Sequence, residues 1–142
     1  MSTVYLESSA VLSWLLGQPR AAEMRRAVDS ATVVVTSVLT LTETERALVR
    51  AEQEEVLSGG DGQRLRGMLG RSGKSWMLMT VSDEVLARAG HRFPVEPVRT
   101  LDALHLATAL AFTRAFPDLR LLSLDRRVAD NANALGIGYG TT

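Results

Sequence analysis

The chain has 142 residues, with 16 basic and 16 acidic side chains and no cysteine. This length suits a single domain spanning residues 1–142, and the 46% of hydrophobic residues can fill its core. The balanced charge excludes nucleic-acid binding by a global basic field, and the lack of cysteine excludes disulfides, thiolate metal sites and a cysteine nucleophile. Because no apolar run is long enough for a membrane helix and the N-terminus lacks the layout of a signal peptide, we expect a soluble, cytoplasmic protein.

Short apolar segments alternate with amphipathic ones along the chain. The apolar, β-favouring segments are predicted as strands over residues 3–6, 31–36, 76–81 and 119–124, with a possible edge strand at 137–139. The segments between them are predicted as helices over residues 10–16, 20–29, 37–51, 63–70, 83–92, 100–111 and 126–135. Residues 58–62 and 71–74 are predicted as loops. This alternation predicts an α/β fold, a three-layer α/β/α sandwich with a mostly parallel central sheet.

The helix predicted over residues 100–111 begins with a conspicuous acid. Thr100 is predicted to cap it, and the Ala and Leu residues that follow have high helix propensity. Asp102 then lies in the first turn, where interaction with the positive end of the helix dipole is a sufficient explanation for an acid. A further role for Asp102 requires that the fold bring other acids beside it.

Acids also occur where the other predicted elements meet. Glu7 and Asp125 come directly after strands, and Glu43 lies on a helix that opens near the same edge of the sheet. In parallel α/β folds, ligands bind beyond the carboxyl ends of the strands, so Glu7, Glu43, Asp102 and Asp125 are expected to converge. Glu45 is an alternative to Glu43, because the two lie on different faces of one helix and only one can point inward.

Converging carboxylates repel one another, and a divalent cation relieves that repulsion. Mg²⁺, or Mn²⁺ in its place, prefers oxygen ligands and usually keeps several waters. Such an ion activates water for phosphodiester hydrolysis and needs no protein nucleophile. The candidate metal-ligating and catalytic residues are therefore Glu7, Glu43, Asp102 and Asp125.

Four segments carry a resemblance to a known family: residues 4–10, 41–48, 101–109 and 122–127. In order and spacing they resemble the acidic motifs of PIN domains, and in style they are most similar to the VapC-type toxins of bacterial toxin–antitoxin pairs. The string Leu-Asp-Ala-Leu-His-Leu-Ala-Thr-Ala in the third segment is the most specific. The resemblance implies a Mg²⁺-dependent ribonuclease that cleaves RNA, is usually a homodimer, and is held inactive by a small antitoxin. It also favours Glu43 over Glu45 as the second acid.

Glu7 departs from the family pattern, which generally places Asp at this position. The additional methylene is expected to push the carboxylate deeper into a site whose ligand distances tolerate little change. Three interpretations stay open. The site re-centres its ion and still cleaves RNA; the chain is a natural variant with weak or lost nuclease activity that works through antitoxin or RNA binding; or the chain was altered to silence a toxic enzyme.

Several other residues have ordinary explanations beside functional ones. His105, one turn after Asp102, is interpreted as a buried structural histidine rather than a base. Ser9 and Ser123 could bind a metal water, but capping and turn formation explain them nearly as well. A receiver-like phosphoacceptor domain is disfavoured, because it needs a lysine late in the chain and the only lysine is Lys74.

A basic stretch follows the glycine-rich segment. It predicts either a rim that contacts phosphates or, slightly favoured, an ordinary charged surface. Its members are Arg64, Arg66, Arg71 and Lys74.

Overall fold

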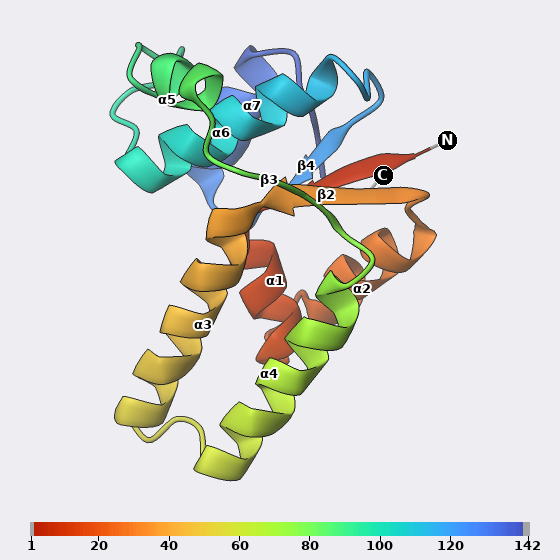
Figure 1. Ribbon diagram of the computed structural model, residues 1–142, viewed down its shortest axis with the longest axis vertical. Coiled ribbons are helices and arrows are strands. Elements are labelled where there is room, and N and C mark those ends of the chain that lie inside the picture. The colour runs from red at the N-terminus through yellow and green to blue at the C-terminus, as the bar shows by residue number, and fades with distance from the viewer. Residues whose placement is uncertain (1, 141–142) are drawn as a thin grey trace.

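The computed structural model describes residues 2–140, which form a five-stranded parallel sheet between two layers of helices (Figure 1). The strands are β1 (Thr3–Leu6), β2 (Val33–Ser37), β3 (Met77–Met79), β4 (Arg120–Leu122) and β5 (Gly138–Tyr139). Their order in the sheet is β3-β2-β1-β4-β5, and every neighbouring pair is parallel. The predicted α/β sandwich is confirmed, with a sheet that is wholly parallel.

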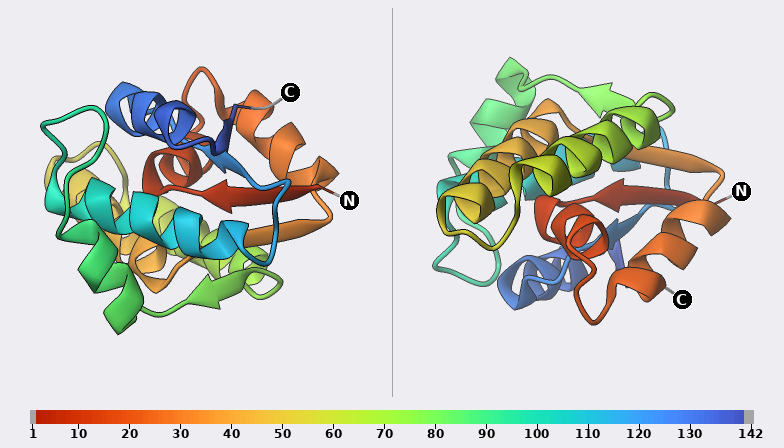
Figure 2. Two further views of the ribbon diagram at one scale, coloured as in Figure 1. Left: turned by 90° about the horizontal axis from the view of Figure 1, so that it is seen from above. Right: turned by 90° about the horizontal axis from the view of Figure 1, so that it is seen from below.

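Two groups of helices cover the opposite faces of the sheet, as the two views of Figure 2 show. One face carries α1 (Ser8–Leu15), α2 (Ala21–Ser30), α3 (Val38–Gln53) and α4 (Gly59–Gly73). The other face carries α5 (Asp83–Ala89), α6 (Thr100–Thr113) and α7 (Arg126–Ala134). Among the described residues, no helix is both long and apolar enough to cross a bilayer.

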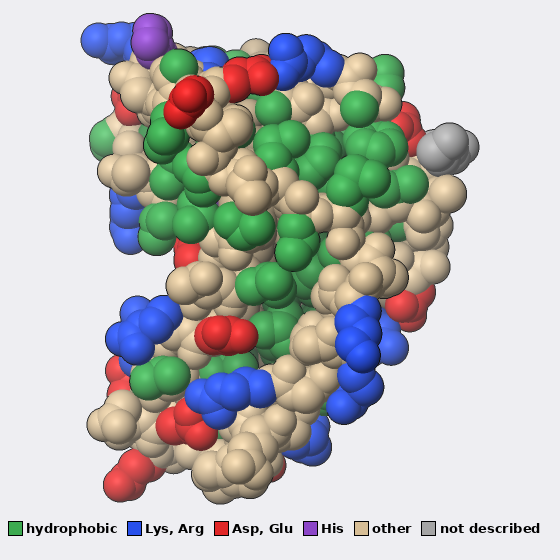
Figure 3. All heavy atoms as spheres, in the orientation of Figure 1, with side chains coloured by type: hydrophobic (Ala, Val, Ile, Leu, Met, Phe, Trp, Pro, Cys, Tyr) green, Lys and Arg blue, Asp and Glu red, His purple; other side chains and the backbone are tan. Residues whose placement is uncertain are grey.

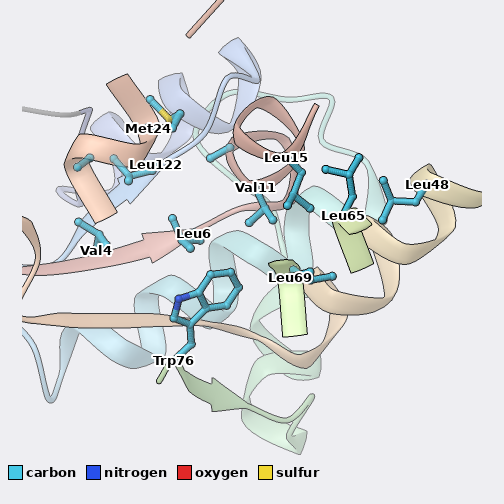
Figure 4. Close-up of a cluster of buried hydrophobic side chains, with 12 residues drawn as sticks. Val4, Leu6, Val11, Leu15, Met24, Leu48, Leu65, Leu69, Trp76 and Leu122 are labelled. Atoms are coloured by element: carbon cyan, nitrogen blue, oxygen red, sulfur yellow. The ribbon is translucent and has the colours of Figure 1, made fainter. Parts of the chain in front are cut away.

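Consecutive strand residues point to opposite faces of the sheet and fill two separate cores. Leu6 packs with Leu69 and Trp76 beneath α1–α4, in the cluster drawn in Figure 4. Tyr5 and Val35 point the other way and pack under α5–α7. Both faces of β1 and β2 are therefore covered, as the unbroken valine run predicted.

Residues 59–62 and 71–73 are helical, so the prediction of loops over 58–62 and 71–74 was wrong. The side chain of Ser58 caps α4 by accepting a hydrogen bond from the backbone of its first turn at 3.1 Å. Leu65 and Leu69 are buried against the first core. Cap and core contacts stabilise a helix that its glycine content alone disfavours, and glycine content was the basis of the prediction.

The strand predicted over residues 76–81 is shorter and lies at the edge of the sheet. Met77 and Leu78 are 48% and 40% exposed, because β3 has a strand on one side only. The face that β3 crosses carries many hydrophobic side chains (Figure 3). Trp76, just before the strand, supplies the buried contact instead.

Candidate active site at the carboxyl edge of the sheet

The strand order places a topological switch point at the centre of the sheet. The chain lays β2 and β3 on one side of β1 and then β4 and β5 on the other. The carboxyl ends of β1 and β4 therefore border the crevice in which parallel sheets bind ligands. Glu7 directly follows β1, and Asp125 lies between β4 and α7.

Glu7 is the N-cap of α1 and is only 3% exposed. Its Oε2 atom accepts a hydrogen bond from the Ser9 amide at 2.5 Å and lies 3.2 Å from the Ser8 hydroxyl. The Ser123 hydroxyl donates to Oε1 at 3.1 Å. The side chain thus turns back onto its own helix, and Glu7 rather than Ser9 caps α1.

Ser9 and Ser123 connect the start of α1 to the end of β4. Their hydroxyl oxygens lie 3.2 Å apart. The Leu124 amide donates to Ser9 Oγ at 2.8 Å, and the Asp125 amide donates to Ser123 Oγ at 3.0 Å. Both hydroxyls therefore shape the backbone, and the Ser123 hydroxyl also holds Glu7, so contacts within the protein account for these two serines.

Glu43 points from α3 toward α6. Its Oε1 atom lies 2.5 Å from Nε2 of His105, and its Oε2 atom lies 3.3 Å from the Ser8 hydroxyl. Glu45 is exposed, so α3 directs Glu43 and not Glu45 toward the other acids. The ring of His105 is buried and hydrogen-bonded at both nitrogens, as expected of a structural histidine.

Asp102 lies half-buried in the first turn of α6. Arg99 is the N-cap, with φ −74° and ψ 157°, and its side chain makes no capping hydrogen bond. The prediction that Thr100 caps this helix was therefore wrong, because the extended backbone ends one residue earlier. Burial raises the pKa of Asp102, and the negative charges of Asp125 and Glu7 raise it further.

Asp125 is the N-cap of α7. Its Oδ1 atom accepts hydrogen bonds from the amides of Arg127 at 2.9 Å and Val128 at 3.3 Å. Capping therefore uses one carboxylate oxygen and does not require the other. Asp125 can act as a helix cap and as a ligand at the same time.

Asp102 and Asp125 line one pocket of about 380 Å³. The rest of its lining consists of three arginines, Arg99, Arg126 and Arg127. Carboxylates can hold a cation there, and guanidinium groups suit a phosphate. No sequence pattern indicated a role for these arginines, although Arg126 and Arg127 fall within the fourth acidic segment.

By donor chemistry the four acids fit a divalent cation, although they do not form a closed cage. Their oxygens are the ligands that Mg²⁺ and Mn²⁺ prefer, and a cation would relieve the repulsion that raises the pKa of Asp102. Within residues 2–140, no three Asp, Glu or His side chains are grouped closely enough to hold a metal. A cation bound here would therefore keep much of its water shell, as Mg²⁺ usually does.

Comparison with known proteins shows what class of protein has this architecture. The model of the PIN domain family matches residues 4–134. The chain is also 36% identical over 138 residues to ribonuclease VapC46 of Mycobacterium tuberculosis (strain ATCC 25618 / H37Rv), a match that covers 96% of this chain and 95% of that protein. The chain therefore belongs to the PIN domain family, as its four acidic segments indicated.

Solved structures share the fold at low sequence identity. The crystal structure of Mycobacterium tuberculosis VapC20, described as a sarcin–ricin loop cleaving toxin, has a TM-score of 0.63 and 16% identity, covering 89% of this chain and 93% of that one. A chain of a toxin–antitoxin complex from Klebsiella pneumoniae has a TM-score of 0.55 and 18% identity, covering 86% of each chain. At these identities the similarity establishes the fold alone.

Proposed function

We propose that this protein is a Mg²⁺-dependent endoribonuclease toxin of a type II toxin–antitoxin pair, and that it hydrolyses RNA phosphodiester bonds with an activated water. The observation that carries the proposal is the position of Glu7, Asp102 and Asp125 at the switch point of the sheet, where burial and then the charges of Asp125 and Glu7 raise the pKa of Asp102. The 36% identity to a VapC ribonuclease supports the same reaction.

In the proposed reaction, Asp102 and Asp125 hold the cation from the pocket that they line, and Glu7 and Glu43 complete the acidic set directly or through waters. When bound, Mg²⁺ or Mn²⁺ lowers the pKa of a water and neutralises charge that develops on the phosphate. The arginines of the pocket, Arg99, Arg126 and Arg127, bind and orient the phosphate.

The proposal includes a small antitoxin that binds and inhibits the chain, and a homodimer as the assembled form. The relatives support the antitoxin part, since one is described as a toxin and another was solved in a toxin–antitoxin complex. Light scattering of the purified chain tests the dimer, with a mass of two chains expected. A mass of one chain at micromolar concentration would contradict this part of the proposal.

A second candidate is a PIN-fold protein with a weak or inactive site that acts by binding an antitoxin or RNA. The three hydrogen bonds received by Glu7 favour it, because the carboxylate must give up at least part of its capping role to bind a cation. Asp, the usual residue at this position, is also a favoured N-cap, yet it is one methylene shorter. The two candidates differ in how the Glu7→Asp variant behaves.

Cleavage of single-stranded and structured RNAs, with Mg²⁺ and with EDTA, tests the function. We expect Mg²⁺-dependent cleavage by the unmodified chain, faster cleavage by Glu7→Asp by about tenfold, and a loss of at least about 100-fold in Asp102→Asn. Glu45→Gln is the matched control, because Glu45 is an exposed acid on the same helix as Glu43. Its cleavage rate is expected to equal that of the unmodified chain.

The pattern of results separates the candidates. If neither the unmodified chain nor Glu7→Asp cleaves any of the RNAs, the ribonuclease proposal fails. Cleavage by Glu7→Asp alone supports the second candidate and locates the defect at the first acid. An equal loss in Glu45→Gln and Asp102→Asn would show that general loss of charge, and not the site, controls activity.

A further inference from the structure

A buried chain of hydrogen bonds ends on the Glu43 carboxylate. The proposed reaction gives no task to the other two members of this chain, Tyr5 and His105. The Tyr5 hydroxyl lies 2.7 Å from Nδ1 of His105, and Nε2 of the same ring lies 2.5 Å from Oε1 of Glu43. Tyr5 is 0% exposed and His105 is 1% exposed, so water does not compete for these bonds. The surrounding core is apolar, with Leu106 and Phe112 packed in the same cluster.

We propose that Tyr5 and His105 are positioning residues, which hold the Glu43 carboxylate so that its second oxygen faces Glu7 and serves the divalent cation. The inference rests on the proposed function for the identity of the cation. The hydrogen-bond pattern itself depends only on the geometry of the metal-free chain.

The geometry determines the direction of the bonds. Nε2 of His105 must carry a hydrogen, because a bare nitrogen would bring its lone pair against the Glu43 carboxylate. In the neutral ring, Nδ1 is then an acceptor, and the hydroxyl of Tyr5 donates to it. The phenol of Tyr5 carries a hydrogen that it can donate.

The hydrogen bond that holds Oε1 of Glu43 also determines where its other oxygen, Oε2, lies. With Oε1 held by His105, Oε2 lies 3.3 Å from the Ser8 hydroxyl, which is also 3.2 Å from Oε2 of Glu7. One hydroxyl therefore lies within reach of both carboxylates and has a single hydrogen to donate. Glu43 is therefore held beside Glu7.

The positioning residues come from the elements that carry the other acids. Tyr5 is on β1, which Glu7 directly follows, and His105 is on α6, one turn after Asp102. The chain Tyr5–His105–Glu43 thus links β1, α6 and α3 through side chains that are far apart in sequence. Outer hydrogen-bond partners of this kind fix the orientation of metal ligands.

Nuclear magnetic resonance of the metal-free chain, with ¹⁵N-labelled histidine, tests the bond pattern. The chain has only two histidines, so a His91→Gln variant identifies the signals of His105. We expect Nε2 of His105 to be protonated in the unmodified chain. A ring with hydrogen on Nδ1 and a bare Nε2 would overturn the proposal.

Calorimetric titration with MgCl₂ and with MnCl₂ tests the positioning role without RNA. His105→Leu removes the donor to Glu43, and we expect the affinity for either ion to fall by about 10- to 100-fold. His105→Gln can still donate from its amide nitrogen and is expected to retain most of the affinity. Tyr5→Phe keeps the ring and removes only the hydroxyl, so a loss of a few fold is expected.

Phe112→Leu is the matched control for core damage. The centroid of its ring lies 6.3 Å from that of Tyr5. A phenylalanine ring forms no hydrogen bond with the Glu43 carboxylate. We expect a lower Tm and an unchanged ion affinity. Should Phe112→Leu weaken ion binding as much as His105→Leu, the effect would be loss of packing, and the positioning role would be wrong.

The inference and the proposed function can fail separately. Ion affinity that does not differ between the unmodified chain and His105→Leu overturns the positioning role, even if the chain cleaves RNA. Conversely, the expected affinity series together with no RNA cleavage would retain the positioning role and reject the ribonuclease. If His105→Leu does not fold, the resonance spectrum and the Tyr5→Phe titration still decide the question.

Discussion

Glu7 combines two tasks in one side chain, the cap of α1 and a proposed ligand. Helix N-caps are usually Ser, Thr, Asp or Asn, because a short polar side chain reaches the free amides of the first turn. Glu7 meets the Ser9 amide and is almost fully buried. A buried carboxylate is tolerated only when donors surround it, and Ser8 and Ser123 supply them. These hydroxyls therefore contribute to stability as well as to the shape of the site.

The hydroxyl of Ser123 is expected to stabilise the fold through Glu7. Ser123→Ala removes a hydrogen bond to a buried charge and also an acceptor for the Asp125 amide, so the free energy of unfolding should fall by about 1.5–3 kcal/mol. Urea unfolding measures the change. Ser13→Ala is the control, because the Ser13 hydroxyl is buried with no hydrogen-bond partner among the described residues. It should alter stability by less than about 0.5 kcal/mol, and an equal loss in both variants would contradict the explanation.

The ionised carboxylate of Asp102 is expected to lower the stability of the folded chain at neutral pH. Its pKa is raised above the ordinary value of 3.8, so the folded chain holds the proton more tightly than the unfolded chain. The free energy of unfolding therefore falls as the pH rises from the ordinary Asp pKa through the raised pKa of Asp102. Asp102→Asn should have a Tm higher by about 2 °C at neutral pH, and this advantage should vanish below the ordinary Asp range. Thermal unfolding at neutral pH and at a pH below the ordinary Asp range checks this. A variant that is less stable than the unmodified chain at neutral pH would contradict it.

At the scale of elements, the segment between α5 and α6 determines where α6 begins. The two oxygens of Glu96 accept hydrogen bonds from the amides of Phe93 at 2.8 Å and Val98 at 2.7 Å. Asn131 of α7 accepts a bond from the Val95 amide and donates one to its carbonyl, each at 2.9 Å. The segment thus reaches α6 in a defined conformation. The position of Asp102 therefore depends on contacts outside its own helix.

Glu96 is expected to make the stability of this segment depend on pH. Hydrogen bonding to the Phe93 amide, and secondarily to the Val98 amide, lowers the pKa of Glu96 below 4.5. The contribution of Glu96 to the free energy of unfolding is therefore present above the ordinary Glu pKa. It is lost as the pH falls through the lowered pKa of Glu96. Glu96→Gln should have a slightly lower Tm than the unmodified chain at neutral pH, with the difference disappearing in acid. Glu45→Gln, an exposed helical acid, should show no such convergence.

At the scale of the whole molecule, a basic side chain contributes to RNA binding only where its charge is not already paired with an acid. The formal net charge is zero, so no global field attracts RNA. On α4, Arg66 pairs with Glu52 at 2.5 Å and Arg64 lies 3.8 Å from Asp61, which favours the ordinary charged surface for that stretch. The arginines of the acidic pocket are the better candidates for contacts with the phosphate backbone.

Replacing one pocket arginine should weaken RNA binding in a salt-dependent way. With Asp102→Asn as the background to prevent cleavage, Arg126→Ala is expected to reduce the salt slope of RNA affinity by about one. Fluorescence anisotropy of a labelled single-stranded RNA over a range of NaCl concentrations measures the slope. Arg64→Ala serves as the control and should leave it unchanged. A larger effect of Arg64→Ala would place the RNA on α4 instead.

Much of the fold could be predicted from the sequence, because its signals are local. The unbroken valines of β2, the amphipathic helices and the order of the acidic segments indicated the α/β class and the family. The errors also have local causes. Glycines in α4 were judged by intrinsic preference, while the Ser58 cap and core packing decided the structure.

By itself, the sequence determined the α/β class, the PIN family and which acids follow the strands, since each depends on local patterns and on their order along the chain. The tertiary structure alone decided which atoms those acids meet. Glu7 turns onto α1, Glu43 faces His105, and Asp102 and Asp125 share a pocket with arginines. The Glu43–His105 contact and the pocket shared by Asp102 and Asp125 join residues separated by tens of positions. Such pairings arise from the packing of α3, α6 and α7 around the sheet edge, which no local preference specifies.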